Sequence, residues 1–188
     1  MGKNKPQPAA AGRSGQAPPA GIELLVLDVD GVLTDGRIVL DAQGGEAKRF
    51  HVLDGAGIKY WQRLGKHAAF LSGRSSPAIA HRAAELGVTL VRQNAKDKLP
   101  AYESILAELG LDDARTAVMG DDLPDLPIMR RCGFAIAPAN AVEEIRQAAA
   151  LVTQRSGGEG AVREAIEYIL RNSGLWQKVT ARYMGQER

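Results

Sequence analysis

The sequence is poor in the residues that build several common kinds of site. It has one cysteine, Cys132, and three histidines among its 188 residues. A single thiol excludes an internal disulfide framework and a cysteine-based zinc site, and it fits a reducing compartment. Three scattered histidines are too few for a transition-metal cluster, so we interpret His51, His67 and His81 as ordinary polar positions.

Long apolar runs and a large excess of one charge are also missing. No apolar run reaches the length of a membrane span. The formal net charge is +2, which provides no broad electrostatic footprint for nucleic acid. The first twenty residues are rich in Ala, Pro, Gly and Gln and lack the apolar centre of a secretory signal, so we expect residues 1–20 to form a disordered leader. Neither a membrane nor a nucleic acid is therefore an expected partner.

What the sequence does contain is an alternation of strand and helix patterns. Apolar runs predict strands at 22–28, 67–73, 88–92, 116–121, 133–138 and 150–153. Helical spacing predicts helices at 54–65, 77–86, 98–109 and 160–172, and Gly44 and Gly45 supply the turn of a β-hairpin over 36–52. The expected fold class is α/β, a doubly wound (Rossmann-like) parallel sheet with a β-hairpin flap. We expect one domain over residues 21–172, followed by a C-terminal tail over 173–188.

Polar residues gather where the predicted strands end. Asp28 and Asp30 follow the first strand, and Lys98 opens the helix after the third strand. The second and fourth strands end in the groups Ser72-Gly73-Arg74 and Gly120-Asp121-Asp122. Because the carboxyl ends of parallel strands share one edge of the sheet, we expect these side chains to meet there.

Asp28 and Asp30 raise an electrostatic question, because two carboxylates so close together repel each other unless a cation or a proton intervenes. Mg²⁺ takes oxygen ligands and would remove the repulsion, and Asp28 with an acid of the group Gly120-Asp121-Asp122 would provide part of such a site. A carboxylate held in this way can attack phosphorus and form an aspartyl-phosphate. Lys98 would offset the charge of the transferring group. Asp30 can protonate the leaving oxygen and then activate the water that cleaves the intermediate.

The segments DVDGVLTDG, LSGR and MGDDLPDLPIM, together with Lys98, resemble the four motifs of the haloacid dehalogenase superfamily of phosphohydrolases. The resemblance implies that Asp28 is the nucleophile and Asp30 the general acid/base. It implies that Ser72 holds the phosphate and Lys98 neutralises it. The metal ligands it implies are Asp28, the backbone carbonyl of Asp30, and Asp121, with Asp122 and Asp125 in support.

The spacing of the motifs leaves no room for a cap domain, because only a hairpin and a helix separate Asp30 from Ser72. The hairpin together with FHVLDGAGIK, SGR, DKL, GDDLPD and GGEGAVRE resembles the 3-deoxy-D-manno-octulosonate 8-phosphate phosphatases, from Ile22 to Asn172. This resemblance implies a cytoplasmic, Mg²⁺-dependent enzyme of lipopolysaccharide precursor synthesis. It also implies a homotetramer, in which the hairpins form a barrel and neighbouring subunits close each site.

A sugar acid phosphate as substrate needs further polar contacts. Basic side chains suit its carboxylate, and the candidates are Arg74, Arg163, Lys48 and Arg49. Thr34 and Gly73 complete the predicted substrate-binding set. In the tail, Leu175, Trp176, Val179 and Tyr183 form an apolar group, and the sequence leaves open whether it packs on its own subunit or on a partner.

Three alternatives bear on this interpretation. A response-regulator receiver also combines Asp, Ser/Thr and Lys, but its acid pair follows the first strand and its acceptor Asp a middle strand, the reverse of the order here. A non-catalytic assembly module, like those fused to some sialic acid cytidylyltransferases, is disfavoured by the intact Asp28, Asp30, Ser72, Lys98 and Asp121. A phosphatase of a nine-carbon sugar acid phosphate remains open, although Arg74 favours the eight-carbon substrate.

Overall fold

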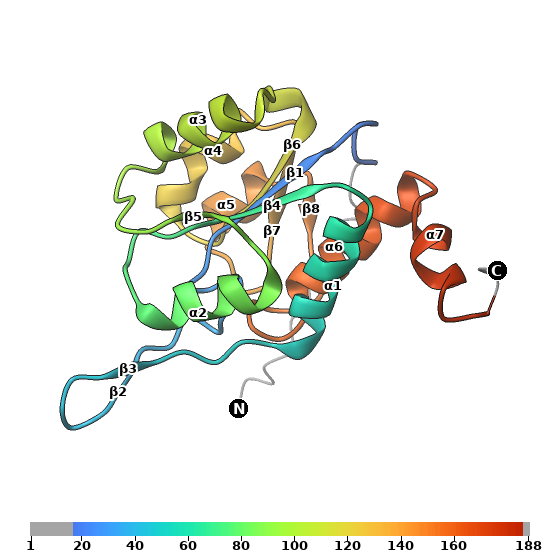
Figure 1. The fold of residues 1–188 in the computed structure, drawn as a ribbon. Coiled ribbons are helices and arrows are strands. Elements are labelled where there is room, and N and C mark those ends of the chain that lie inside the picture. Colours follow the sequence, from blue (N-terminus) through green and yellow to red (C-terminus); the bar gives the residue numbers. More distant parts are fainter. Residues whose placement is uncertain (1–16, 186–188) are drawn as a thin grey trace, which may run out of the picture.

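A single parallel sheet lies at the centre of the computed structural model, which describes residues 17–185 (Figure 1). Its six strands follow the order β5-β4-β1-β6-β7-β8. The strands are β1 (Leu24–Leu27), β4 (His67–Leu71), β5 (Leu90–Arg92), β6 (Thr116–Met119), β7 (Phe134–Ala137) and β8 (Leu151–Val152). All six predicted strands are present, and the predicted doubly wound α/β class is confirmed.

Helices cover both faces of the sheet (Figure 1). One face carries α1 (Val52–Arg63), α2 (Pro77–Leu86) and α6 (Ala161–Asn172), and the other carries α3 (Lys98–Leu109), α4 (Leu126–Met129) and α5 (Glu143–Ala148). Strand β1 serves both cores, because Leu25 and Leu27 pack on the first face while Leu24 and Val26 pack on the second. This explains why the first apolar run does not alternate with polar residues.

The strand register fixes which residues form the carboxyl edge. Leu27 pairs with Phe70 of β4 and with Met119 of β6, so the chain leaves all three strands at the same level. Asp28 extends this pairing by donating its backbone N–H to the carbonyl of Met119 at 3.0 Å. The predicted polar residues therefore emerge at one edge of the sheet.

The predicted hairpin is present, but its paired part is short. It consists of β2 (Val39–Leu40) and β3 (Glu46–Ala47), which pair antiparallel and project from the body of the molecule (Figure 1). Asp41 closes the turn, because its Oδ1 accepts hydrogen bonds from the backbones of Gln43 and Gly45. Helix α1 then begins two residues before the predicted start, since the His51 imidazole caps it by accepting from the backbone N–H of Leu53.

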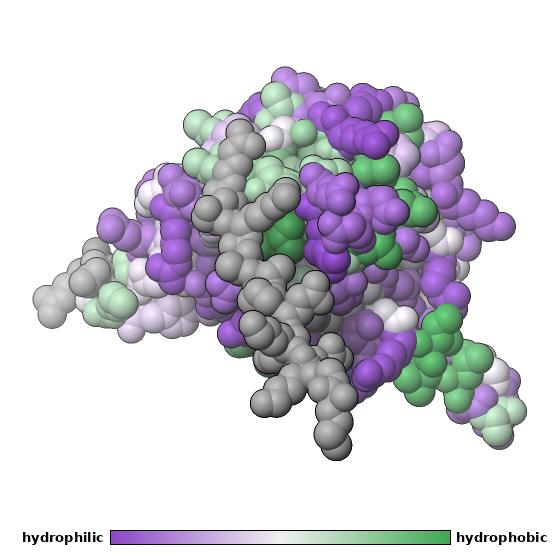
Figure 2. Space-filling view, turned by 180° about the vertical axis from the view of Figure 1, so that it is seen from behind, coloured by the Kyte–Doolittle hydropathy of each residue, from purple (hydrophilic) through white to green (hydrophobic). Residues whose placement is uncertain are grey.

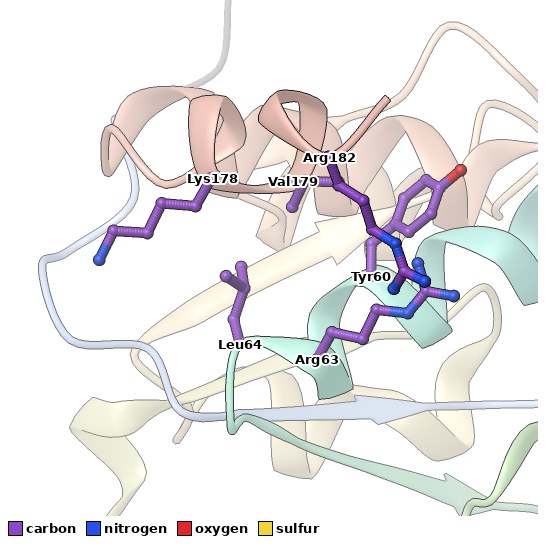
Figure 3. A pocket seen from close by; sticks show the side chains of 6 residues that line it. All are labelled: Tyr60, Arg63, Leu64, Lys178, Val179 and Arg182. Atoms are coloured by element: carbon purple, nitrogen blue, oxygen red, sulfur yellow. The ribbon is translucent and has the colours of Figure 1, made fainter. Parts of the chain in front are cut away.

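The tail forms a short helix that the sequence did not predict, α7 (Trp176–Ala181), and this helix packs against α6 and the core of the same chain. The Tyr60 ring of α1 makes edge contacts with the rings of Trp176 and Tyr183 at 6.2 and 6.0 Å. A cavity of about 340 Å³ remains between α1 and α7, and Figure 3 shows Arg63 and Arg182 extending along it. Residues 1–16, most of the predicted leader, and residues 186–188 lie outside the described part of the chain.

None of the helices within residues 17–185 is long and apolar enough to cross a membrane.

Candidate active site

Asp28 and Lys98 meet at the carboxyl edge, in the buried centre of the candidate site. Lys98 opens α3, which is capped by the Asp97 carboxylate, and its ammonium lies 2.5 Å from Oδ1 of Asp28. It also lies 2.5 Å from Oδ1 of Asp125. These three side chains are at most 7% exposed. The structure thus brings Asp28 and Lys98 together, as the sequence predicts. The sequence predicts only a supporting role at the metal for Asp125, whereas the structure puts it in direct contact with the lysine.

Asp125 also organises the acidic loop after β6. Its second carboxylate oxygen accepts hydrogen bonds from the backbone N–H groups of Asp121 and Asp122, at 3.1 and 3.4 Å. Asp122 in turn caps the short 3₁₀ turn Leu123–Asp125. The loop is therefore held from within, and Asp121 is left to direct its carboxylate toward the edge.

Asp121 completes a cluster in which three carboxylates surround one ammonium group, that of Lys98. Oxygen atoms of Asp28, Asp121 and Asp125 lie within 4.8 Å of one another. The pKa of Asp121 is raised to about 7, chiefly by burial and then by the charge of Asp125, while Lys98 opposes the shift. The pKa of Asp28 is likewise raised to about 8, chiefly by burial, with Lys98 opposing the shift and Asp125 adding to it. When all three carboxylates are ionised, the single ammonium leaves two negative charges uncompensated, so the cluster fits a hard divalent cation such as Mg²⁺.

The loop after β1 approaches Asp121 so closely that it requires glycine. Gly31 has φ +105°, and a Cβ at this position would collide with the Asp121 carboxylate. Thr34 shapes the same loop, because its hydroxyl donates to the carbonyl of Val29 and accepts from the backbones of Gly31 and Gly36. Thr34 is 2% exposed, so its hydrogen bonds give it a loop-shaping position, and its part in substrate binding stays a prediction.

A second group of charges surrounds Asp30, beside the buried cluster. The Lys48 ammonium, from the end of the hairpin, forms an ion pair with Oδ1 of Asp30. The hydroxyl of Ser72 donates to the other oxygen of Asp30 at 3.4 Å and accepts from the backbone of Arg74 at 3.1 Å. Burial lowers the pKa of the Lys48 ammonium, but the hydrogen bonds to Asp30 and Glu46 raise it by more, so the pKa is raised overall. Asp30 therefore faces a cationic neighbour that the sequence had named only as a possible sugar contact.

Arg74 and Gly73 follow Ser72 at the same edge, whereas the side chain of Arg163 contacts residues of the helices and the tail. The Arg74 guanidinium lies 3.5 Å from Glu46 of the hairpin. The Arg163 guanidinium pairs with Glu167 at 2.7 Å and lies over the rings of Tyr60 and Trp176. These contacts place it between α6, α1 and the tail, so its predicted contact with substrate remains untested.

Asn140 is a site-shaping residue that the sequence analysis missed. Its amide donates to the carbonyl of Gly31 at 3.1 Å and accepts from the backbone of Gly157 at 2.7 Å. A Cβ at Gly157 would collide with that same Gly31 carbonyl. The segment Gly157-Gly158 is therefore packed backbone to backbone against the loop that carries Asp30. No local pattern marks Asn140, because its partners lie far away in the sequence.

Comparisons with known proteins identify the class first. Residues 88–166 match the family described as haloacid dehalogenase-like hydrolase. The 3-deoxy-D-manno-octulosonate 8-phosphate phosphatase KdsC of Yersinia pestis is 42% identical over 151 residues, which cover 80% of this chain and 81% of that protein.

Two solved structures agree with the fold. A probable YrbI family phosphatase from Pseudomonas syringae is 44% identical with a TM-score of 0.85, covering 87% of this chain and 93% of that one. The 3-deoxy-D-manno-octulosonate 8-phosphate phosphatase of Moraxella catarrhalis, solved with magnesium, phosphate and KDO, is 39% identical with a TM-score of 0.84. The match covers 87% of this chain and 94% of that one. The chain belongs to the family of haloacid dehalogenase-like hydrolases that contains these sugar acid phosphatases, which confirms the resemblance in the four motifs.

Proposed function

We propose that this protein is a Mg²⁺-dependent phosphatase that hydrolyses 3-deoxy-D-manno-octulosonate 8-phosphate to 3-deoxy-D-manno-octulosonate and phosphate. The observation that carries the proposal is the meeting of Asp28, Lys98 and Asp121 at one sheet edge, with Asp30 beside them. The identity to phosphatases that bear this substrate in their names supports the choice of sugar acid. The reaction would serve lipopolysaccharide precursor synthesis in the cytoplasm.

In the proposed mechanism Asp28 attacks the phosphorus atom. A bond forms between its carboxylate oxygen and phosphorus, while the bond from phosphorus to the sugar oxygen breaks. Asp30 donates a proton to that leaving oxygen. Asp30 then removes a proton from a water molecule, which attacks the phosphorus of the aspartyl-phosphate and frees Asp28 and inorganic phosphate. Lys98 and Ser72 hold the transferring phosphoryl group, since both lie next to the two acids.

The donor set at the edge fits the metal that this chemistry needs. Asp28, Asp121 and the backbone carbonyl of Asp30 would hold Mg²⁺, while Asp125 orients the acidic loop and Lys98. When bound, the ion neutralises the surplus charge of the carboxylates and allows an anionic nucleophile to approach an anionic phosphate. Its presence in the Moraxella catarrhalis relative supports this assignment.

We further propose that the active form is a homotetramer. The hairpin and the start of α1 expose five large apolar side chains, Ile38, Val39, Leu40, Val52 and Leu53. Leu40 is 62% exposed and Val52 75% exposed, and Figure 2 shows hydrophobic surface on the projecting hairpin. An isolated two-stranded hairpin is marginal alone, and shared pairing between subunits would bury this surface. Residues 21–172 would form the catalytic domain of each subunit.

A panel of phosphate esters tests the function. The purified chain is assayed for phosphate release from the eight-carbon sugar acid phosphate, from its nine-carbon analogue and from a neutral sugar phosphate, with and without Mg²⁺. We expect the highest kcat/KM on the eight-carbon substrate, and only with the metal. A preference for the nine-carbon substrate would move the assignment to the nonulosonate phosphatases. The absence of turnover on every ester would favour the non-catalytic assembly module.

A further inference from the structure

Lys48 is a buried lysine on a hairpin that is otherwise exposed. Its side chain is 2% exposed, whereas Val39 and Leu40 on the facing strand are 47% and 62% exposed. Lysine is almost never fully buried without a charged partner. The burial of Lys48 therefore has a specific cause, and that cause lies in the acids around its ammonium group.

Glu46 and Lys48 direct their side chains to the same side of the hairpin. Glu46 lies in β3 and Lys48 directly follows it, and residues two positions apart along an extended chain point to the same face. On that face the Lys48 ammonium pairs with Asp30 and lies 2.7 Å from the Glu46 carboxylate, which in turn lies 3.5 Å from the Arg74 guanidinium. The hairpin thus docks on the sheet edge through charges and leaves its apolar side chains facing outward.

Asp30 is held by this arrangement from two sides. Lys48 contacts one carboxylate oxygen, and the hydroxyl of Ser72, at the end of β4, donates to the other at 3.4 Å. Asp30 itself lies in a loop, and its side chain is 22% exposed. Packing therefore restricts the Asp30 side chain less than it restricts the buried Asp28. The direction of the Asp30 carboxylate depends on its contacts with Lys48 and Ser72.

We infer that Lys48 is a positioning residue, which holds the Asp30 carboxylate from the hairpin in the orientation that serves the leaving oxygen. The inference rests on the proposed function, in which Asp30 is the general acid/base. It gives the hairpin of each subunit a role in that subunit's own chemistry, in addition to any role in assembly. General acid catalysis depends strongly on a geometry of this kind.

The role predicts a dependence on the leaving group. An alkoxide from a sugar leaves only with a proton, so its release needs Asp30 in place. The nitrophenolate of p-nitrophenyl phosphate leaves without a proton, so its release should not need Asp30. Since both substrates form the same aspartyl-phosphate, the two cases separate only in the first turnover, before water attacks the shared intermediate.

The experiment compares wild type, Lys48→Met and Lys48→Arg as full-length, Mg²⁺-loaded enzymes by rapid quench. We expect Lys48→Met to slow first-turnover release of the sugar by about 10²-fold. The nitrophenolate burst should keep its wild-type rate, while the steady state slows on both substrates. Lys48→Arg, which retains a cation, should recover most of the lost rate. Asp30→Asn gives the reference for complete loss of the acid.

Lys59→Met is the matched control, because Lys59 is an exposed lysine of α1 outside the site, and it should behave as wild type. Sedimentation of each variant establishes that its assembly is unchanged. Equal slowing of both leaving groups in the first turnover, or no slowing of either, would overturn the inference. If the wild-type enzyme did not hydrolyse the sugar acid phosphate at all, the proposed function would fail. The role of Lys48 could then still be measured with another alkyl phosphate.

Discussion

The sheet edge and the hairpin differ in which side chains they bury and which they expose. At the edge, Asp28, Lys98 and Asp125 are at most 7% exposed and hold one another by charge. On the hairpin, Ile38 and Leu40 are 56% and 62% exposed. The difference indicates that the groups proposed for phosphoryl transfer are assembled within one chain, whereas the apolar surface of the hairpin is left exposed by that chain. Changes at the edge should therefore impair turnover without impairing assembly, and changes to the exposed apolar side chains of the hairpin should impair assembly first, with a smaller effect on turnover.

The strongest test of the edge is Asp28→Asn. An amide cannot attack phosphorus usefully, so we expect turnover to fall by at least about 10³-fold while the fold and the oligomeric state persist. Phosphate release and sedimentation of the same sample measure the two properties. A variant that retained turnover close to that of wild type would refute the nucleophile assignment, and a dissociated variant would erase the contrast between the two regions.

Removal of the metal should have an effect almost as large. Chelation should abolish phosphate release, and added Mg²⁺ should restore it, because the cluster at the edge has surplus negative charge without a cation. Ca²⁺ should inhibit, since it prefers a looser and higher coordination. Assembly should be insensitive to chelator. Full activity in chelator would count decisively against a metal-dependent mechanism.

Leu40→Glu tests the hairpin. A charge on this exposed apolar side chain should prevent its burial between subunits and give species smaller than the proposed tetramer, measured by light scattering. We expect kcat/KM for the sugar acid phosphate to fall by about tenfold, because the walls that hold a sugar would be lost. The nitrophenolate burst should be unaffected. Gln43→Glu, in the exposed turn, provides a control of equal charge. A tetramer in Leu40→Glu would contradict the proposed packing.

The stability of the metal-free protein should depend on pH through the edge. The pKa of Asp121 is raised from 3.8 to about 7, so between these values the folded state binds a proton that the unfolded state does not. The free energy of unfolding should therefore decrease as pH rises from about 4 to about 7. Mg²⁺ should weaken this dependence because it takes the place of the proton. Thermal unfolding at several pH values, with chelator or with Mg²⁺, measures the effect. A metal-free protein that became more stable over this range would show that the acids are not crowded as described.

The smallest effect is expected in the tail, which belongs to neither region. Trp176→Ala should remove the ring contacts with Tyr60 and Arg163 and lower the free energy of unfolding by about 1–2 kcal/mol. Kinetics and assembly should stay unchanged, because the tail packs on its own subunit. A clear rise in KM would instead support the predicted contact of Arg163 with substrate.

The features that could be predicted from the sequence are those marked by residues close together in the chain. Helices α2 and α3 have the predicted bounds, because Ser76 and Asp97 cap their starts and glycines in the left-handed conformation follow their ends. The strand ends were visible as apolar runs that stop at an acid or at a Ser-Gly pair. The meeting of Asp28 and Lys98 then followed from parallel topology alone.

What sequence reasoning could not reach depends on contacts between distant segments. Asn140 binds Gly31, and Asp54 accepts from the backbone of Arg163, in both cases across 109 residues. The side chain of Arg163 extends toward Tyr60 and the tail, a choice of rotamer that no spacing encodes. Lys48 looked like an ordinary surface lysine until the hairpin was placed against Asp30.

The packing of Gly157 against Gly31 has a consequence for folding during synthesis on the ribosome. The loop that bears Asp30 leaves the ribosome early, but its backbone is held by Asn140 and by the N–H of Gly158, which donates to Val32 at 3.0 Å. Folding of this loop must therefore wait for the segment near residue 160, and contacts of such long sequence separation form slowly. A ribosome-bound chain halted before Gly157 should be catalytically silent, even though Asp28, Asp30 and Lys98 have already been synthesised. The nascent protein thus gains its activity only after Gly157 and Gly158 have emerged and can pack against the loop.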